Sequence, residues 1–357
     1  MSYRILAINP GSTSTKIAVF EDNKEVFVTT LRYSLEELSG YENVIAQFDF
    51  RRESIMKALK DNGIALENID VIVGRGGLVK PIESGVYEVN DSMLRDLRIG
   101  VGGEHASNLG GIIAHDLARD IKGCRAYIAD PVVVDELQDV ARISGHPLFE
   151  RKSIFHALNQ KTIARKYAAS IDSSYEKLSL IVAHLGGGVS VGVHKMGKVI
   201  DVNDALGGEG PFSPERSGTL PAYDLAKLCF SGRYTLKEIQ KMIVGGGGLI
   251  AHLGTNSFQV VAEKVAEGDV EYMLISEAFV YNVAKSIGAA ATVLSGNVDA
   301  ILITGGIAYG AEAVEKISKR ISFIAPVKVY PGEDEMAALA ENGYNVLSGK
   351  DTAKVYV

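Results

Sequence analysis

Two turns rich in small residues carry the side chains best suited to chemistry, and each turn follows an apolar run. The first lies between Asn9 and Lys16 and offers amide, hydroxyl and ammonium donors from Asn9, Ser12, Ser14 and Lys16. The second is the run His184-Leu185-Gly186-Gly187-Gly188. Glycine in such a turn lets backbone N–H groups approach an anion without interference from a Cβ atom. Since phosphate binding needs convergent donors and a cation, the turns predict two phosphate sites in two similar halves.

A third glycine turn and two arginines extend the predicted site. Gly305-Gly306 follows the apolar run 300–304, where backbone could again meet a nucleotide. Arg75 stands between glycines after a short apolar run, and Arg216 precedes a predicted helix. Phosphoryl transfer spreads negative charge over equatorial oxygens, and the guanidinium group matches that geometry. The alternative for each arginine is an ordinary ion pair with a carboxylate.

Four other polar side chains are weaker candidates when taken alone. Asp130 ends an apolar run, His156 lies near the start of a predicted helix, and His105 follows Gly103-Glu104. A single histidine is more often a core residue than a catalytic one. Glu333 precedes the last predicted helix, where an acidic residue favours the helix dipole but could also reach Mg²⁺, directly or through water.

Two familiar motifs match by chance only, and a third is absent. The run 188–192 has the spacing of a nucleophile elbow, but that elbow needs a strand followed by a helix, and the alternation around Ser190 continues as a strand. The run 192–199 nearly matches a P-loop, but Val199 replaces the hydroxyl residue that would contact Mg²⁺. The seven histidines lack the spacing of a metal site.

The elements that must position these residues occur twice in the same order. Three short alternating runs predict a β-meander in each half, at 4–8, 17–20 and 26–31, and again at 178–183, 189–194 and 199–202. Helices and single strands alternate after each meander, which indicates the α/β class. The repeat predicts two related domains, residues 1–150 and 151–334. The last helix, from about residue 335 to 357, is expected to pack back on the first domain.

Composition narrows the class of protein. The chain has 357 residues, of which 46% are hydrophobic and 23% charged, and its net charge is −7 without any basic cluster, so a nucleic-acid surface is not expected. Two isolated cysteines and an N-terminus without a signal-peptide pattern favour the cytoplasm. The long apolar helix predicted over 272–294 carries Glu277 and Lys285, which indicates a buried core helix or an interface rather than a membrane span.

Together these motifs resemble those of the acetate and butyrate kinases. The resemblance begins with the run 9–16 and the turn 184–188, and it covers nearly the whole chain in the family's order, through Arg75, Asp130-Pro131, His156, Glu215-Arg216-Ser217-Gly218 and Thr304-Gly305-Gly306. Some features are more similar to the butyrate kinases than to the acetate kinases, namely Pro10, Thr13, Thr15, the turn 74–77 and the glycine run 245–248.

The resemblance implies two duplicated actin-like (ribonuclease H-like) domains, each with a mixed five-stranded sheet, around a cleft that binds ATP and Mg²⁺. It also implies reversible transfer of the γ-phosphoryl group to a short-chain fatty acid. By this resemblance the nucleotide phosphates are bound by Asn9, Ser12, Ser14, Lys16, His184, Gly186, Gly187, Gly188, Gly305 and Gly306. Arg75, Asp130, His156 and Arg216 are the implied catalytic residues, His105 and Arg75 contact the acid, and Asn9 with Glu333 approaches the metal. A homo-oligomer is expected.

Several alternatives stay open for the substrate and for the class of protein. Ser257 and Gln259 stand where acetate kinases have an acid and an arginine, which leaves the purine preference undecided. Acetate, propionate or a branched acid could replace butyrate as substrate. A hydroxyl kinase of the same fold would need a general base, and Asp130 is the candidate, whereas a carboxylate is already ionised at neutral pH. A non-catalytic nucleotide switch, or a plain binding protein, would ignore acids altogether.

Overall fold

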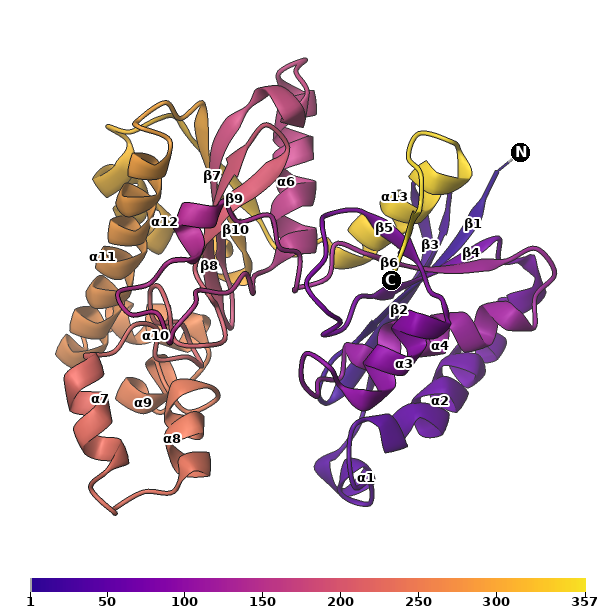
Figure 1. The fold of residues 1–357 in the computed structure, drawn as a ribbon, viewed down its shortest axis with the longest axis horizontal. Helices are drawn as coiled ribbons and strands as arrows, with labels where there is room; N and C mark the ends of the chain where they lie inside the picture. The colour runs from indigo at the N-terminus through magenta and orange to yellow at the C-terminus, as the bar shows by residue number, and fades with distance from the viewer. Residues whose placement is uncertain (1) are drawn as a thin grey trace. The chain divides into compact units, whose positions relative to one another are not determined.

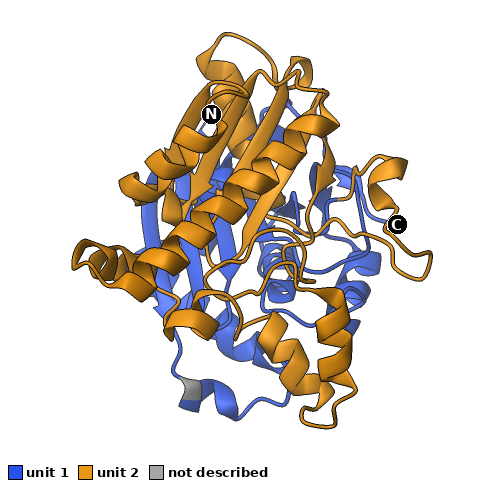
Figure 2. Ribbon diagram, turned by 90° about the vertical axis from the view of Figure 1, so that its left-hand side faces the viewer, with its two compact units in different colours: residues 1–134, 334–357 blue, residues 135–333 orange. Residues whose placement is uncertain are grey.

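The chain forms two compact units, each built around one sheet (Figure 1, Figure 2). The computed structural model describes residues 2–357, apart from the side chain of Leu35. The first unit comprises residues 1–134 and 334–357, and the second comprises residues 135–333. The division falls at Asp135 rather than near Glu150. The segment after Asp135 is bonded within the second unit, since Asp135 pairs with Arg142 and Glu136 pairs with Lys161.

The sheet of the first unit is mixed and has seven strands within the described residues. Its order is β12-β5-β6-β4-β1-β2-β3. The strands are β1 (Arg4–Pro10), β2 (Ser14–Glu21), β3 (Lys24–Arg32), β4 (Val71–Arg75), β5 (Val86–Glu88), β6 (Arg125–Ala129) and β12 (Lys354–Val355). The first three form the expected antiparallel meander, and β4 and β6 follow in parallel. Five strands were expected here; β5 and β12 have only three and two residues, too few to show a period-two pattern.

Helices cover both faces of this first sheet (Figure 1). On one face lie α2 (Phe48–Asp61), α3 (Asp91–Ile99) and α4 (Asn108–Arg119), and on the other lies α13 (Glu335–Leu347). A Cβ atom on Gly74 would come within 2.2 Å of the Gly110 carbonyl oxygen, so α4 lies directly against β4. On the opposite face, a Cβ on Gly343 would lie 2.7 Å from Val73. The shorter helices are α1 (Leu35–Ser39), η1 (Ile45–Gln47) and η2 (Leu66–Asn68).

The second unit repeats the central topology of the first. Its sheet has the order β11-β10-β7-β8-β9, which corresponds strand for strand to β6-β4-β1-β2-β3. The strands are β7 (Ser179–Leu185), β8 (Val189–Lys195), β9 (Lys198–Val202), β10 (Ala300–Gly305) and β11 (Val327–Pro331). Again three antiparallel strands are followed by two parallel ones. The α/β class and the internal repeat that the sequence predicts are therefore confirmed.

Two apolar cores sandwich this second sheet. On one face α6 (Ala157–Ser170) packs through Ile163 and Tyr167 against Val182. On the other face α11 (Val270–Val293) and α12 (Ala311–Ile321) pack against Ile181 and Val191. The remaining helices are α5 (Asp139–Arg142), η3 (Tyr175–Lys177), α7 (Ala222–Cys229), α8 (Leu236–Ile243), α9 (Leu249–Leu253), α10 (Phe258–Ala266) and η4 (Gly306–Tyr309). Among residues 2–357, no helix combines the length and the apolar character that crossing a membrane requires.

Candidate active site

The first glycine turn joins β1 to β2 and is held from beneath by a buried arginine. Arg51 of α2 has no exposed surface, and its guanidinium donates to the carbonyl oxygens of Gly11 (2.8 Å), Ser12 (2.9 Å) and Ser14 (3.0 Å). The Gly11 N–H closes the turn on the Ser14 carbonyl at 2.8 Å. Burial lowers the pKa of Arg51 from its usual value, yet arginine remains charged at neutral pH. A fixed positive charge therefore lies directly under this turn.

The side chains predicted to bind phosphate surround the same turn. Asn9 is the penultimate residue of β1 and is paired in register with Lys16 of β2. Ser12 and Lys16 are exposed, whereas Asn9 and Ser14 are half-buried. Arg51 itself was missed by sequence reasoning. A signal existed, because Arg51, Ile55 and Leu59 are spaced by four residues, and a charged residue in that apolar stripe indicates a buried charge with partners.

Arg75, at the end of β4, is paired with a carboxylate of α13. Its Nη2 lies 3.1 Å from Glu335 Oε1, and its Nη1 lies 3.3 Å from Asn9 Oδ1. The Asn9 amide also donates to Glu335. The sequence paired Asn9 with Glu333, but in the structure the carboxylate beside Asn9 is that of Glu335. Both residues precede or begin the same helix, so composition alone cannot tell which one faces the strand ends.

Asp130 and His105 lie elsewhere in the first unit. Asp130 is buried at the end of β6 with a φ of 37°, and its Oδ1 accepts from the Ser84 hydroxyl (2.6 Å) and the Gly85 N–H (2.9 Å). His105 is exposed, and its Nδ1 accepts from the Ser107 N–H at 3.1 Å. Because that nitrogen is an acceptor, the ring proton of a neutral His105 is on Nε2. The catalytic role of Asp130 and the acid-binding role of His105 stay predictions.

The second glycine turn joins β7 to β8 and lies against Arg216. The Gly186 N–H bonds the Gly188 carbonyl at 3.0 Å, and the Ser213 hydroxyl donates to the Gly187 carbonyl at 2.6 Å. A Cβ atom on Gly188 would stand 1.9 Å from Nη1 of Arg216, so only glycine leaves room for that guanidinium. The Arg216 Nη1 donates to the Ala205 carbonyl at 2.7 Å, and burial lowers its pKa.

Two imidazoles stack beside this second turn. The rings of His156 and His184 are 3.7 Å apart between centroids and nearly parallel. His156 is the N-cap of α6 rather than part of the helix, and His184 is buried near the end of β7. The Nε2 of His184 lies 3.0 Å from Glu333 Oε1, and its Nδ1 lies 2.8 Å from Asn159 Oδ1. The structure thus brings His156, His184 and Glu333 together. The contact of Glu333 with the metal stays a prediction.

The third glycine turn, after β10, abuts the strand that carries His184. Gly305 has a φ of 93°, and a Cβ there would lie 2.3 Å from the Leu185 carbonyl oxygen, so this position requires glycine. Its backbone exchanges hydrogen bonds with Gly332. A Cβ on Gly306 would meet nothing within 4 Å. The first glycine of this turn therefore has no room for a side chain, whereas the second has free space where a Cβ atom would lie.

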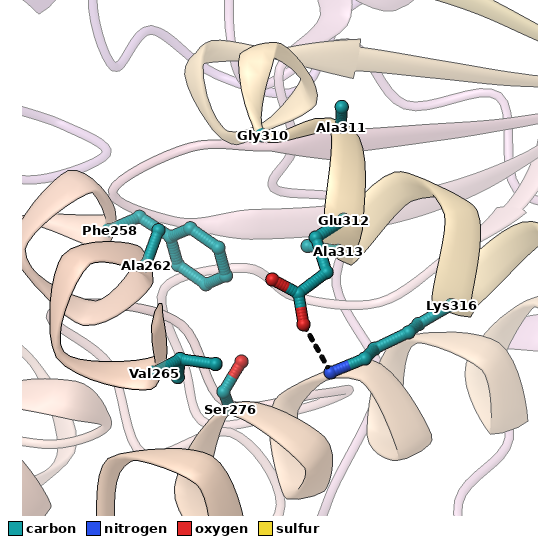
Figure 3. Close-up of a pocket in the computed structure, with 9 residues that line it drawn as sticks. All are labelled: Phe258, Ala262, Val265, Ser276, Gly310, Ala311, Glu312, Ala313 and Lys316. Carbon is teal, nitrogen blue, oxygen red and sulfur yellow. Dashed lines mark ion pairs between the residues drawn. The ribbon is translucent and has the colours of Figure 1, made fainter. Parts of the chain in front are cut away.

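A cavity of about 220 Å³ lies between α10, α11 and α12 (Figure 3). The Phe258 ring and the small side chains of Ala262, Val265 and Ala313 make it largely apolar. Polar groups reach it from Ser276 and from Glu312, which pairs with Lys316 at 2.7 Å. Two residues flanking Phe258 are engaged locally, since Ser257 caps α10 and Gln259 bonds Glu263.

The repeated strand order, with a glycine turn after the first strand of each copy, defines a duplicated α/β fold of the actin and hexokinase type. A solved acetate kinase from Porphyromonas gingivalis shares it with a TM-score of 0.78 at 19% identity, covering 97% of this chain and 100% of that one. A solved propionate kinase from Francisella tularensis matches with the same TM-score and identity, over 95% and 98% of the two chains.

Sequence comparison identifies the family. The chain is 58% identical over 356 residues to Butyrate kinase 2 of Clostridium acetobutylicum, which covers 100% of both proteins. It is 54% identical to a probable butyrate kinase of Bacteroides thetaiotaomicron over 99% of each. The model of the acetokinase family matches residues 146–357. The chain belongs to the acetokinase family, and the resemblance inferred from its motifs is confirmed.

Proposed function

We propose that this chain transfers the γ-phosphoryl group of ATP to butyrate, giving butanoyl phosphate and ADP, and that it catalyses the reverse reaction as well. The observation that carries the proposal is the 58% identity to a butyrate kinase along the entire chain. The grouping of the expected phosphate-binding side chains around the glycine turns of each unit supports it. Acetate, propionate and branched short acids are the competing substrates within the family.

The chemistry requires positioning and charge compensation rather than a base. A carboxylate is ionised at neutral pH, so it can attack phosphorus directly once repulsion from the triphosphate is compensated. In our proposal the first unit contributes Asn9, Ser12, Ser14, Lys16 and Arg75. The second unit contributes the backbone of its two glycine turns with His156, His184 and Arg216. Cations and N–H donors of this kind stabilise the charge that spreads over the equatorial oxygens.

Arg75 and Arg216 have separate roles in this proposal. Arg75 is already tied to Glu335 and Asn9, and a quarter of its side chain is exposed, which suits contact with the incoming carboxylate. Arg216 is half-buried against the second glycine turn and is aligned by the Ala205 carbonyl, which suits contact with the transferring phosphoryl group. His105 and Asp130 are kept as further contributors from the first unit, to the acid site and to the orientation of the cations.

Mg²⁺ fits the oxygen donors next to the first turn. The amide oxygen of Asn9 and the carboxylate of Glu335 are hard ligands of the type that Mg²⁺ takes together with nucleotide phosphates and water. Within residues 2–357, no three His, Cys, Asp or Glu side chains are grouped to hold a metal. We therefore infer that Mg²⁺ arrives with ATP and is held by Asn9, Glu335 and the phosphates, where it would neutralise phosphate charge.

The apolar cavity beside Phe258 is our candidate for the purine base. It opens next to the N-terminus of α12, just after the turn at Gly305-Gly306 and η4. A flat aromatic base suits a pocket with one aromatic wall and a few polar groups. Ser257 and Gln259 are engaged within α10, so they leave base selection to Ser276 and Glu312 in this proposal.

A hydroxamate assay across C2 to C5 acids tests the proposed reaction. We expect acyl phosphate formation to depend on Mg-ATP and to be fastest with butyrate. Each methylene buried in the acid pocket is worth about 0.8 kcal/mol, so discrimination between neighbouring acids will be only severalfold. Phosphorylation of alcohols, with loss of all activity in Asp130→Asn, would instead indicate a hydroxyl kinase. ATP hydrolysis that ignores added acids would indicate a nucleotide switch.

We further propose that the chain acts in the cytoplasm as a homo-oligomer. Large apolar side chains are exposed on α8, on α11 and just after α7, with Phe230 at 92%, Val270 at 79% and Leu236 at 73%. Large apolar side chains this exposed can be covered by an interface between subunits. We expect light scattering to give a mass of at least twice 38.2 kDa, and Phe230→Ser with Leu236→Ser to lower it. A monomeric mass at micromolar concentration would contradict the proposal.

A further inference from the structure

Strand β8 presents two chemically different faces. Its valines, Val189, Val191 and Val193, belong to the apolar core under α11 and α12. The residues that alternate with them are Ser190, Gly192 and His194, and they point to the opposite face, where α6 packs. The run 188–192, which has the spacing of a nucleophile elbow, therefore continues into a strand, and Ser190 belongs to the polar face of that strand.

The polar face of β8 carries an unbroken series of hydrogen bonds that ends at His156. The Ser190 hydroxyl lies 2.8 Å from His156 Nδ1 and 2.8 Å from Gln160 Nε2. Gln160 Oε1 lies 2.9 Å from His194 Nε2, and His194 Nδ1 lies 2.7 Å from the Tyr175 hydroxyl. Ser190, Gln160 and His194 have no exposed surface, and Tyr175 is 3% exposed.

The direction of these bonds can be worked out from one end. Gln160 Nε2 also lies 3.1 Å from the Ser190 carbonyl oxygen, which only accepts, so this atom is the amide nitrogen. The other amide atom is then an oxygen and accepts a proton from His194 Nε2. Burial lowers the pKa of His194 well below its usual value, so the ring is neutral and its Nδ1 accepts from Tyr175.

The hydrogen bonds of Ser190 also determine which ring nitrogen of His156 carries the proton. The Ser190 oxygen accepts from Gln160 and has a second lone pair, so it could either donate its proton to His156 Nδ1 or accept a proton from that nitrogen. We assign the first direction, because in the second the buried hydroxyl proton would have no acceptor among the described residues. A neutral His156 whose Nδ1 accepts must carry its proton on Nε2. That nitrogen is the one on the far side of the ring from Ser190. It can donate to an anionic oxygen, whereas the opposite tautomer would present a lone pair to that oxygen and repel it.

The glycine at position 192 belongs to this arrangement. A Cβ atom there would stand 2.3 Å from Gln160 Oε1 and 3.2 Å from His194 Nε2. Any side chain at this position would push the Gln160 amide out of its place between Ser190 and His194. The requirement for glycine at position 192 thus follows from the hydrogen bonds and not from a turn, since Gly192 lies inside β8.

We propose that Ser190, Gln160 and His194 are positioning residues that hold His156 in the tautomer with its proton on Nε2, ready to donate to the transferring phosphoryl group. The assignment of the tautomer stands on the hydrogen bonds alone, and its use in catalysis rests on the function proposed above. The rival explanation is that these bonds only satisfy buried polar groups. The two explanations differ in what the loss of the Ser190 hydroxyl does to kcat.

Nitrogen-15 NMR of histidine-labelled full-length protein tests the tautomer directly. The His156 signals are assigned by their loss in His156→Gln. In the unmodified protein we expect Nδ1 to be unprotonated and Nε2 to be protonated. In Ser190→Ala we expect a mixture of tautomers, because the donor to Nδ1 is gone. A ring protonated on Nδ1 in the unmodified protein would overturn the proposal, whether or not any variant folds.

Steady-state kinetics with butyrate and Mg-ATP test the use of the tautomer. Misplacing a catalytic group costs up to about 100-fold, so we expect Ser190→Ala and Gln160→Met to lower kcat by about 10- to 100-fold with KM for Mg-ATP changed less than about twofold. Ser170→Ala, on the same helix as Gln160 and bonded only to the Tyr167 carbonyl, is the matched control and should keep full activity.

If Ser190→Ala shifts the tautomer but retains kcat, the catalytic role is wrong. If the unmodified protein forms no acyl phosphate, the proposed function fails while the tautomer result stands.

Discussion

Arg216→Ala is expected to lower kcat by about 100-fold or more while the protein stays folded. The guanidinium is enclosed above the second glycine turn, and its Nη1 is aligned by the Ala205 carbonyl at 2.7 Å. In such a low-dielectric setting its attraction for a phosphoryl oxygen is stronger than in water. Because that charge matters most when negative charge spreads in the transition state, kcat should fall more than KM for ATP rises. Hydroxamate kinetics and a thermal melt measure both quantities.

Gly188→Ala is the companion change for this prediction. It leaves Arg216 in the chain but places a methyl group where Nη1 now lies, so it should reproduce most of the loss in kcat. Arg233→Ala provides a matched control, because Arg233 is exposed and contacts the ring of Tyr234. Near-normal turnover in Arg216→Ala would remove this arginine from the mechanism. Normal turnover in Gly188→Ala alone would show that the guanidinium can act from another position.

Arg51→Met is expected to destabilise the protein by about 3 kcal/mol or more and to weaken ATP binding. The substitution keeps a long side chain but leaves the carbonyls of Gly11 and Ser12 without their donor, and it removes one of the two donors to the Ser14 carbonyl, which keeps the Gly11 N–H. Each buried group left unsatisfied costs roughly 1–3 kcal/mol. The turn would also lose the positive charge beneath it. Chemical denaturation measures the stability, and the thermal shift produced by Mg-ATP measures the binding.

Arg52→Met is the neighbouring control. Arg52 is about a quarter exposed and pairs with Asp116, so its loss should cost no more than about 1 kcal/mol and should leave the response to Mg-ATP unchanged. If both substitutions proved equally mild, the bonds from Arg51 to the turn would not be supporting it. If Arg51→Met lost stability but kept its full Mg-ATP shift, the arginine would serve folding alone.

The repeated meanders could be predicted because apolar residues alternate with polar or small ones along strands such as β3 and β8. The apolar runs 180–183 of β7 and 300–303 of β10 were equally clear, since both faces of each strand are covered and no polar residue interrupts either run. The glycine turns followed from the same patterns, because each one ends such a run. The duplication and the candidate phosphate-binding residues could therefore be predicted from the sequence.

Contacts between residues that are far apart in the chain could not be predicted from the sequence. The pairing of Asn9 with Glu335 joins positions 326 residues apart, and no local pattern distinguishes Glu335 from Glu333. Arg51 lies in a helix with ordinary amphipathic spacing, and only the packed turn shows what its charge does. Ser190 was set aside as part of a false motif, because its partner Gln160 belongs to a helix 30 residues earlier in the chain.

The discontinuous first unit has a consequence for how the polypeptide matures. Helix α13 covers the face of β1 and β4 through buried side chains such as Met336 and Leu339, and the ribosome makes it only after residues 135–333 are complete. A nascent chain therefore carries an uncovered apolar sheet face throughout the synthesis of the second unit. Domains made first usually fold first, but here the earlier one must wait for the later one. We therefore expect chains truncated before Glu335 to aggregate more readily than the full-length chain.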